Sequence, residues 1–252
     1  MSKVMNAGVH RPSVETIWHE SGASPGSGHQ SRARLLRLHP HGDSSILEPQ
    51  AHTSWLLRRL CRATNRTIAA SSLAPRGPLI DVREFAWTAT LRREWRAIRD
   101  EARDAGWRDQ MLWQGGLPAS DLADRCPVTA RTLSGIPGLH NAAFAALPAG
   151  VHVPVRHGLT KALITCHLGL AVPRDGDARM RLRDRVVRWA EGETLLFDDS
   201  YDHALWNDGS APRVVLHLQF ARPLRQPGLG LATLILRALR HAAPPLARVS
   251  PL

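Results

Sequence analysis

His203 and Arg213 are the two residues of this chain whose types and spacing most clearly suggest chemistry. His203 ends the polar stretch 198–203, and Arg213 follows ten residues later at the head of an apolar, β-rich run. A neutral imidazole can bind a metal ion, and a guanidinium can bind a carboxylate through two parallel hydrogen bonds. Because a His on a connecting loop and an Arg opening the next strand can face one site, the pair suggests an iron centre with an oxo-acid co-substrate.

Three further imidazoles in the same half of the chain, those of His152, His157 and His167, lie near expected strand ends. Non-haem iron is commonly held by two His and one carboxylate, with the carboxylate often two residues after the first His. His157 and His203 are followed by Gly-Leu and Ala-Leu, so neither begins such a motif. Spacing alone therefore leaves the iron site open, since a His at a strand end is also a common hydrogen-bonding residue.

Short strands are the elements expected to position these residues. From residue 141 onward, apolar runs alternate with turn signals such as Gly158, Asp175-Gly176 and Asp208-Gly209. This pattern is typical of an antiparallel sandwich or barrel and not of alternating strands and helices. The expected strands are residues 141–147, 151–155, 162–172, 180–182, 186–189, 194–197 and 213–220.

The segment before these strands is expected to be helical, because apolar residues follow helical spacing over residues 85–102 and a helical turn is expected at 129–133. The domain organisation expected is a largely disordered or weakly helical N-terminal extension at 1–75, one domain at 80–225 and a basic C-terminal tail at 226–252. Two further short helices are expected, at residues 54–63 and 231–241.

Composition limits the partners and the compartment. The net charge is +11, but only Lys3 and Lys161 are lysine, which leaves 31 of the 33 basic residues as scattered Arg. That bias indicates the base composition of the source genome rather than a nucleic-acid-binding face, so no nucleic acid partner is expected. Three Cys without a CxxC pair, no signal-like N-terminus and no apolar run long enough to span a membrane predict a cytoplasmic protein.

Five motifs in a fixed order carry a specific resemblance. They are REFAWTATLRREWRAIRDE at 83–101, CPVTARTLSGIPGL at 126–139, CHLGLAVP at 166–173, a WxEGxxLLFDDSYDHALWN run at 189–207 and RVVLHLQFARP at 213–223. From about residue 81 to 223 the chain resembles the aspartyl/asparaginyl β-hydroxylase family. The resemblance implies a mainly β, double-stranded β-helix of jelly-roll or cupin type, with N-terminal helices packed on it.

The resemblance also implies a reaction. Members of that family use iron(II) and 2-oxoglutarate as cofactors, hydroxylate an unactivated C–H bond and convert the co-substrate to succinate. The substrate class it implies is a small molecule, or an amino acid in a peptide or on a carrier. The β-carbon of an aspartyl- or asparaginyl-type residue is the substrate position expected first. No feature of the sequence indicates an oligomeric state.

The resemblance assigns roles residue by residue. The family holds iron with two His and no carboxylate, and His203 matches the second of these ligands. Arg213 matches the Arg that binds the distal carboxylate of 2-oxoglutarate, and His167 matches a residue that also contacts the co-substrate. Thr165 stands where the family often has an Arg, so it is expected on the co-substrate side, with Lys161 as a source of the missing charge.

The first iron ligand is where the chain departs from the family. An ungapped match puts Arg156 on the ligand position and His157 beside it. Neighbouring strand residues face opposite sides, so His157 reaches the iron only if a bulge or the turn at Gly158 redirects the chain. His152 is expected on the same face as Arg156, but about 13 Å away at roughly 3.3 Å per residue.

Two hypotheses follow. In the first, His157 and His203 bind the metal and form, with Arg213, the catalytic set of a 2-oxoglutarate-dependent dioxygenase. In the second, the cation of Arg156 repels iron, and the chain is a degenerate relative that binds a ligand or a partner. Asp198 and Asp199 are expected in both cases to form the turn before His203 and to orient its ring.

Overall fold

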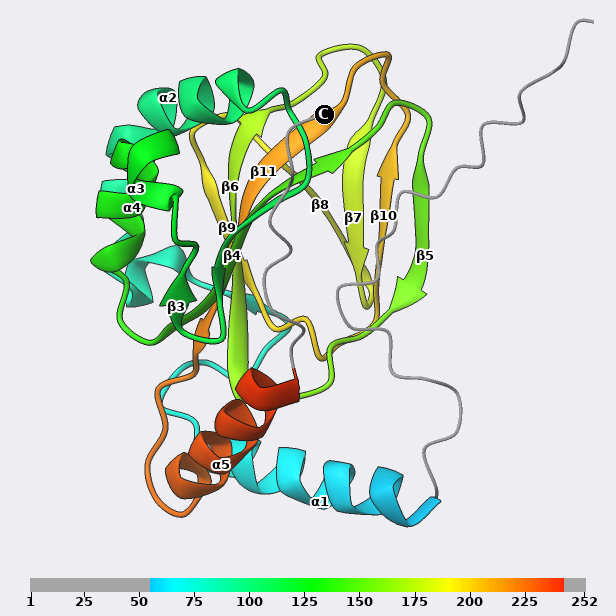
Figure 1. The fold of residues 1–252 in the computed structure, drawn as a ribbon. Coiled ribbons are helices and arrows are strands. Elements are labelled where there is room, and N and C mark those ends of the chain that lie inside the picture. Colours follow the sequence, from blue (N-terminus) through cyan, green and yellow to red (C-terminus); the bar gives the residue numbers. More distant parts are fainter. Residues whose placement is uncertain (1–54, 243–252) are drawn as a thin grey trace, which may run out of the picture. The chain divides into compact units, whose positions relative to one another are not determined.

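The structure, a computed structural model, describes residues 55–242, with side chains described for residues 59–240 (Figure 1). Expectations for residues 1–54 and 243–252 lie outside the described residues, and these include most of the N-terminal extension and the end of the C-terminal tail. Within the described residues, no helix has both the length and the apolar content needed to cross a membrane.

Helices come first and last in the described part, and strands fill the middle. The helical elements are α1 (Trp55–Ala70), the 3₁₀ turn η1 (Val82–Glu84), α2 (Thr88–Asp104), α3 (Leu122–Arg125), α4 (Pro127–Ser134) and α5 (Gly228–Ala242). The strands are β1 (Leu79–Ile80), β2 (Gln110–Gln114), β3 (Leu117–Pro118), β4 (Leu139–Leu147), β5 (His152–Arg156), β6 (Leu163–Ala171), β7 (Ala178–Leu182), β8 (Arg185–Arg188), β9 (Thr194–Phe197), β10 (His203–Asn207) and β11 (Arg213–Ala221).

These strands form two antiparallel sheets with a nested pairing. The seven-stranded sheet has the order β1-β9-β6-β11-β4-β2-β3, and the four-stranded sheet has the order β5-β10-β7-β8. β4 pairs with β11, β5 with β10, β6 with β9 and β7 with β8. A long antiparallel hairpin rolled over itself gives this pattern, with successive pairs going to alternate sheets, and it defines a jelly roll. The expected mainly β, double-stranded β-helix fold is confirmed.

Side-chain alternation gives the seven-stranded sheet two different faces. Along β11, Leu216, Leu218 and Phe220 lie in the core beneath the helices, whereas Val215 lies in the cluster between the sheets. Helices α2, α3 and α4 cover the outer face of this sheet, on the side away from β5, β7 and β10 (Figure 1). The inner face therefore remains for the four-stranded sheet and for the polar residues between the two.

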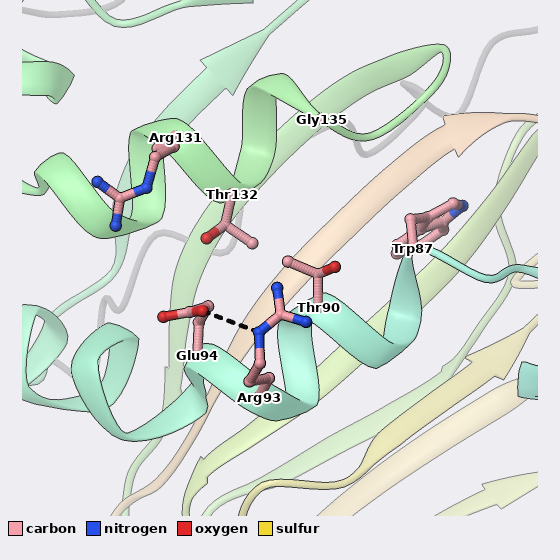
Figure 2. Close-up of a pocket in the computed structure, with 7 residues that line it drawn as sticks. All are labelled: Trp87, Thr90, Arg93, Glu94, Arg131, Thr132 and Gly135. Carbon is pink, nitrogen blue, oxygen red and sulfur yellow. Dashed lines mark hydrogen bonds and ion pairs between the residues drawn. The ribbon is translucent and has the colours of Figure 1, made fainter.

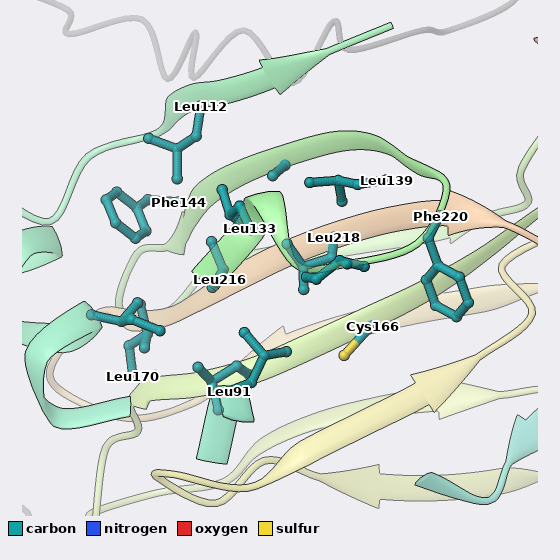
Figure 3. Packing of buried hydrophobic residues seen from close by; sticks show 14 of the residues in the cluster. Leu91, Leu112, Leu133, Leu139, Phe144, Cys166, Leu170, Leu216, Leu218 and Phe220 are labelled. Atoms are coloured by element: carbon teal, nitrogen blue, oxygen red, sulfur yellow. The ribbon is translucent and has the colours of Figure 1, made fainter. Parts of the chain in front are cut away.

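The core beneath the helices fixes the seven-stranded sheet in place (Figure 3). Phe144 and Phe220 are its largest fully buried side chains. The ring of Phe220 meets the rings of Phe85 and Trp87 edge-on, each with centroids 5.0 Å apart. Truncating such a Phe to Ala typically costs about 3–5 kcal/mol. This contact joins the segment before α2 to the strand that carries Arg213.

The flanking helices are longer than expected. α1 continues to Ala70 and α5 begins at Gly228, and the two helices contact each other. Ile68 of α1 and Ala232 of α5 lie in one buried cluster with Leu224. Packed helices thus continue on both sides of the segment 80–225. The helices expected at 85–102 and 129–133 are present as α2 and α4.

Candidate active site

Most of the candidate residues lie on the inner faces of the two sheets. Alternation along β11 places Arg213, His217 and Gln219 on the inter-sheet face. On the neighbouring strand β6, His167 lies opposite His217 and Thr165 lies opposite Gln219. One face of two adjacent central strands therefore carries five polar side chains.

Arg213 is buried, and none of the described residues forms an ion pair with it. It is 5% exposed, and the central carbon of its guanidinium lies 4.3 Å from the centre of the Trp189 ring. Its Nε is buried and has no hydrogen-bond partner among the described residues. Burial lowers the pKa of Arg213 to about 10, so it is still a cation at neutral pH. Because an unpaired buried charge is costly, this arrangement favours the binding of an anion.

His167 and His217 form a hydrogen-bonded pair next to Trp189. The indole Nε1 of Trp189 donates to Nδ1 of His167 over 3.1 Å, and Nε2 of His167 lies 2.9 Å from Nδ1 of His217. Both ring nitrogens of His167 are thus engaged within the protein. Burial, followed by the charges of neighbouring groups, holds the pKa of His167 well below its usual range and lowers that of His217 to about 4.

His203 is held by the backbone, not by a carboxylate. Its Nδ1 lies 3.0 Å from the carbonyl oxygen of Tyr201, and donation to this carbonyl leaves Nε2 with a free lone pair. Burial lowers the pKa of His203, and the charges of Arg156 and His157 act in the same direction. His203 opens β10, so the expectation that it lies on a loop is wrong. Tyr201 takes the orienting role expected of Asp198 and Asp199.

Asp198 fixes the turn that delivers His203 to the sheet. One carboxylate oxygen accepts hydrogen bonds from Arg222 at 2.6 Å and from Lys161 at 3.1 Å. The other oxygen accepts from the backbone N–H and the hydroxyl of Ser200. Arg222 and Asp198 are both almost fully buried, so this ion pair joins the end of β11 to the turn. Lys161 is engaged here, not on the inner face beside Arg213.

Asp199 links that turn to β6, β11 and the end of β5. Its carboxylate accepts hydrogen bonds from the hydroxyl of Thr165 at 3.0 Å and from the amide of Gln219 at 2.9 Å. Its backbone carbonyl accepts from the N–H of Gly158 at 2.7 Å. A Cβ at Gly158 would meet the Asp199 carboxylate, which explains the need for glycine there. Thr165, expected to bind the co-substrate, donates its hydroxyl to Asp199 in this structure.

A bulge in β5 decides which residue faces His203. The register pairs His203 with Arg156 but Leu205 with Val153, so β5 holds one extra residue between the two pairs. Arg156 therefore lies directly opposite His203. Its charge also acts on His217, where it is the largest effect on the pKa after burial.

His157 and His152 lie elsewhere. The His157 ring is 66% exposed, and its Nδ1 lies 3.5 Å from a carboxylate oxygen of Asp202. His152 pairs with Trp206 and stacks on it, with ring centroids 4.6 Å apart. The expectation that His152 shares the face of Arg156 is wrong, because the extra residue in the bulge reverses the alternation between them.

The chemistry of these residues fits an oxo acid better than it fits iron. Arg213 offers a buried cation with an unused Nε–H, which suits a carboxylate. His203 offers one imidazole, but the residue opposite it, Arg156, has no lone pair to give. No cluster of three or more His, Cys, Asp or Glu among residues 55–242 suits a metal ion. As the residues lie, the pair of imidazoles that the resemblance implies is incomplete.

A pocket of about 250 Å³ lies apart from this site, between α2 and α4 (Figure 2). Trp87, Arg93 and Arg131 are among its lining residues, and Arg93 donates to Glu94 at one side. None of its lining residues is a candidate site residue. It lies on the helix-covered side of the seven-stranded sheet, so it does not open onto Arg213.

His217, Gln219 and Trp189 are site residues that the sequence reasoning missed. The signal for the first two was present, because they stand four and six residues after Arg213 in a predicted strand. Trp189 belongs to a recognised motif, but no pattern in the sequence shows that its ring lies against Arg213 and its N–H meets His167.

Comparisons with known proteins agree on one family. A profile described as Aspartyl/Asparaginyl beta-hydroxylase matches residues 84–223. An ornithine lipid ester-linked acyl 2-hydroxylase of Rhizobium tropici is 29% identical over 226 residues, which cover 80% of each chain. The human aspartyl/asparaginyl beta-hydroxylase is 28% identical over 158 residues, 53% of this chain but only 21% of that protein. This chain thus spans about a fifth of the human protein it matches.

Solved structures give only distant likenesses. The cupin domain of Schizosaccharomyces pombe Cnp3 has a TM-score of 0.28 at 16% identity, and covers 34% of this chain and 57% of its own. The DMSP lyase DddQ of Ruegeria pomeroyi has a TM-score of 0.30 at 20% identity, with 45% and 46% covered. The fold therefore rests on the strand pairing. Since the family profile covers more than half of the chain and every residue of the site, the chain belongs to the aspartyl/asparaginyl β-hydroxylase family.

Proposed function

We propose that this chain is a hydroxylase that uses 2-oxoglutarate as co-substrate and iron(II) as its metal. The observation that carries the proposal is Arg213, a buried guanidinium without a partner anion in the described part of the chain. A dicarboxylic oxo acid supplies the missing charge, and its distal carboxylate can accept two hydrogen bonds from the guanidinium. The Trp189 ring against Arg213 keeps water from one side of this contact.

The metal part of the proposal rests on His203. A neutral imidazole with Nδ1 donating to Tyr201 presents Nε2 as a ligand atom. We propose His157 as the second ligand, reached by a further one-residue shift of β5 against β10, which would exchange the faces of Arg156 and His157. In the arrangement described above Arg156 faces His203 instead, so no reaction step is assigned to the metal.

The substrate proposed is a methylene group next to a carbonyl carbon. The β-carbon of an aspartyl residue and carbon 2 of an ester-linked acyl chain, which the names of two relatives describe, share this chemistry. The Rhizobium protein matches over the larger share of both chains, so an acyl ester is proposed beside the amino acid substrate.

A cytoplasmic setting is proposed as well, and the free thiols of Cys61, Cys126 and Cys166 support it.

Succinate formation from 2-oxoglutarate tests the proposed function. The full chain, supplied with iron(II) and ascorbate, is expected to form succinate, faster with its substrate than without. Vesicles containing an ornithine lipid and a peptide containing Asp are the two probes. Arg213→Met should raise the 2-oxoglutarate concentration needed for half-maximal rate by at least about tenfold, since a charge-assisted hydrogen bond is lost. Arg179→Met, on the outer face of β7, is the matched control.

A second candidate function is favoured by Arg156. With Arg156 opposite His203, the exposed guanidinium of Arg156 joins the buried one of Arg213 on the side of the site, and the two suit a dicarboxylate without a metal. On this candidate, the chain binds the oxo acid but forms no succinate with any substrate. Binding without turnover in the experiment above, for the wild type and at saturating iron(II), would favour it over the hydroxylase.

A further inference from the structure

We propose that His217 donates a hydrogen bond to the oxo-acid co-substrate, and that Trp189 fixes this donor by way of His167. The inference rests on the proposed co-substrate and adds a residue to its site. His217 stands in the middle of β11, four residues beyond Arg213 on the same face. A ligand bound to Arg213 and extending along the strand runs toward His217.

The indole of Trp189 determines the direction of both hydrogen bonds in the series from Trp189 through His167 to His217. The Nε1–H of Trp189 can only donate, so Nδ1 of His167 accepts and carries no proton. The proton of the neutral His167 ring is therefore on Nε2, which donates to Nδ1 of His217. By the same logic the proton of His217 is on Nε2. One donor group at Trp189 thus determines the tautomers of two imidazoles.

The Nε2–H of His217 has no hydrogen-bond acceptor among the described residues, although the ring lies in a central strand. His217 is only half-buried, so solvent and a small ligand can reach it. Arg156 is the cation with the largest effect on His217, so the N–H lies in a field that favours an anion or a carbonyl oxygen. These features suit the carboxylate or the oxo group at the end of the ligand remote from Arg213.

The imidazole pair also remains neutral, which keeps the donor in place. Protonation of His217 would put a hydrogen on Nδ1, where the Nε2–H of His167 already points. Burial and the nearby cations lower the pKa of His217 to about 4, in agreement with this geometry. The donor is then the same at every pH at which the protein would work.

Calorimetric titration of the full chain with 2-oxoglutarate, in the presence of Mn²⁺ as a redox-inactive stand-in for iron(II), tests the donor. His217→Leu is expected to weaken binding by at least about tenfold. His217→Gln, whose amide can donate, should recover most of the affinity. Trp189→Phe keeps a ring against Arg213 but deletes the indole N–H, and should weaken binding by an intermediate factor. His152→Leu, on the outer face of β5, should bind like the wild type.

Nitrogen NMR of protein labelled at its His rings tests the tautomers without any ligand. His167 and His217 should each show a protonated Nε2 and an unprotonated Nδ1, unchanged from about pH 5.5 to about pH 8. Trp189→Phe should shift the His167 signals. A protonated Nδ1 at His217 in the wild type would overturn the assignment, whatever the affinities are.

The outcomes separate this inference from the proposed function. If the wild type binds 2-oxoglutarate and Arg213→Met weakens binding, but His217→Leu does not, then His217 is not a donor and the proposed co-substrate stands. If Arg213→Met binds like the wild type, or the wild type does not bind at all, the proposed co-substrate site fails and the role of His217 fails with it. Weak binding by both His217→Gln and His217→Leu would point to a structural role and overturn the donor.

Discussion

Arg156 and His203 face each other across β5 and β10, while their neighbours His157 and Asp202 approach to 3.5 Å in a separate contact. The two contacts lie on opposite sides of the strand pair, because neighbouring residues of a strand face opposite sides. A change that brought His157 opposite His203 would also remove Arg156 from that position. Whether the site can hold a metal therefore depends on the register of β5 against β10, in which a shift of one residue is decisive.

Exchanging the two residues of β5 should create the missing ligand pair. In the double variant Arg156→His, His157→Arg, an imidazole would lie opposite His203 without any shift of the strand. We expect Mn²⁺ affinity to rise by at least about tenfold, because a cation is replaced by a metal ligand. Calorimetry would measure it. Arg156→Met alone is the control, since it removes the charge and adds no ligand; an equal gain there would show that repulsion, not ligand number, limits binding.

Breaking the buried ion pair between Asp198 and Arg222 should destabilise the protein. The two groups lie 2.6 Å apart and are nearly inaccessible to solvent, so removal of Arg222 leaves the buried carboxylate with Lys161 as its remaining cationic partner among the described residues. Arg222→Met is expected to lower the free energy of unfolding by about 3 kcal/mol, measured by urea denaturation. The exposed pair of Arg83 and Asp81 provides the control, and Arg83→Met should change nothing measurable.

The double variant Asp198→Asn, Arg222→Met tests the reason for that loss. Because it removes both charges of the buried pair and leaves only the partly exposed Lys161 ammonium without its carboxylate, it should recover part of the stability lost in Arg222→Met. If the double variant were no more stable than Arg222→Met, the charge left behind by the loss of Arg222 would not be the cause.

Stability should fall as the pH falls below about 6.5. Burial lowers the pKa of His217 from 6.5 to about 4, and the pKa values of His167 and His203 move in the same direction. Between pH 6.5 and pH 4 the unfolded chain therefore binds protons that the folded chain does not, so the folded state loses stability over this window. Asp199, whose pKa burial raises, acts in the opposite direction.

His217 accounts for about 2 kcal/mol of this loss in the free energy of unfolding, after discounting for its partial exposure. Urea denaturation at about pH 7.5 and about pH 5 would measure it, with His217→Leu as the comparison. The variant should lose less stability than the wild type on acidification. Parallel slopes for the two proteins would contradict a low pKa at His217.

Much of the fold followed from periodicity. The strands expected at 194–197 and 213–220 are present as β9 and β11, and the helical spacing over 85–102 corresponds to α2. β10 was missed because the polar residues of the preceding turn hide the start of a strand only five residues long. Turn chemistry and strand pattern overlap at His203, and the tertiary pairing with β5 and β7 decides between them.

The candidate site was less accessible to sequence reasoning, for two physical reasons. The bulge in β5 consists of a single extra residue, and its position depends on pairing with β10, which no local pattern encodes. The chain from Trp189 through His167 to His217 joins three strand regions that are distant in sequence. The role proposed for Arg213 needed only residue type and position, and its burial without a partner among the described residues supports that proposal.

Titration of iron(II) and 2-oxoglutarate into the protein without oxygen tests the central claim most directly. The readout is the visible charge-transfer band that appears when both bind at one site. The account predicts a band in the wild type, lost in His203→Ala and Arg213→Met and kept in His152→Ala. No band in the wild type, together with a band gained in the Arg156→His, His157→Arg variant, would contradict it. That result would show that the protein keeps the family fold but does not bind the metal.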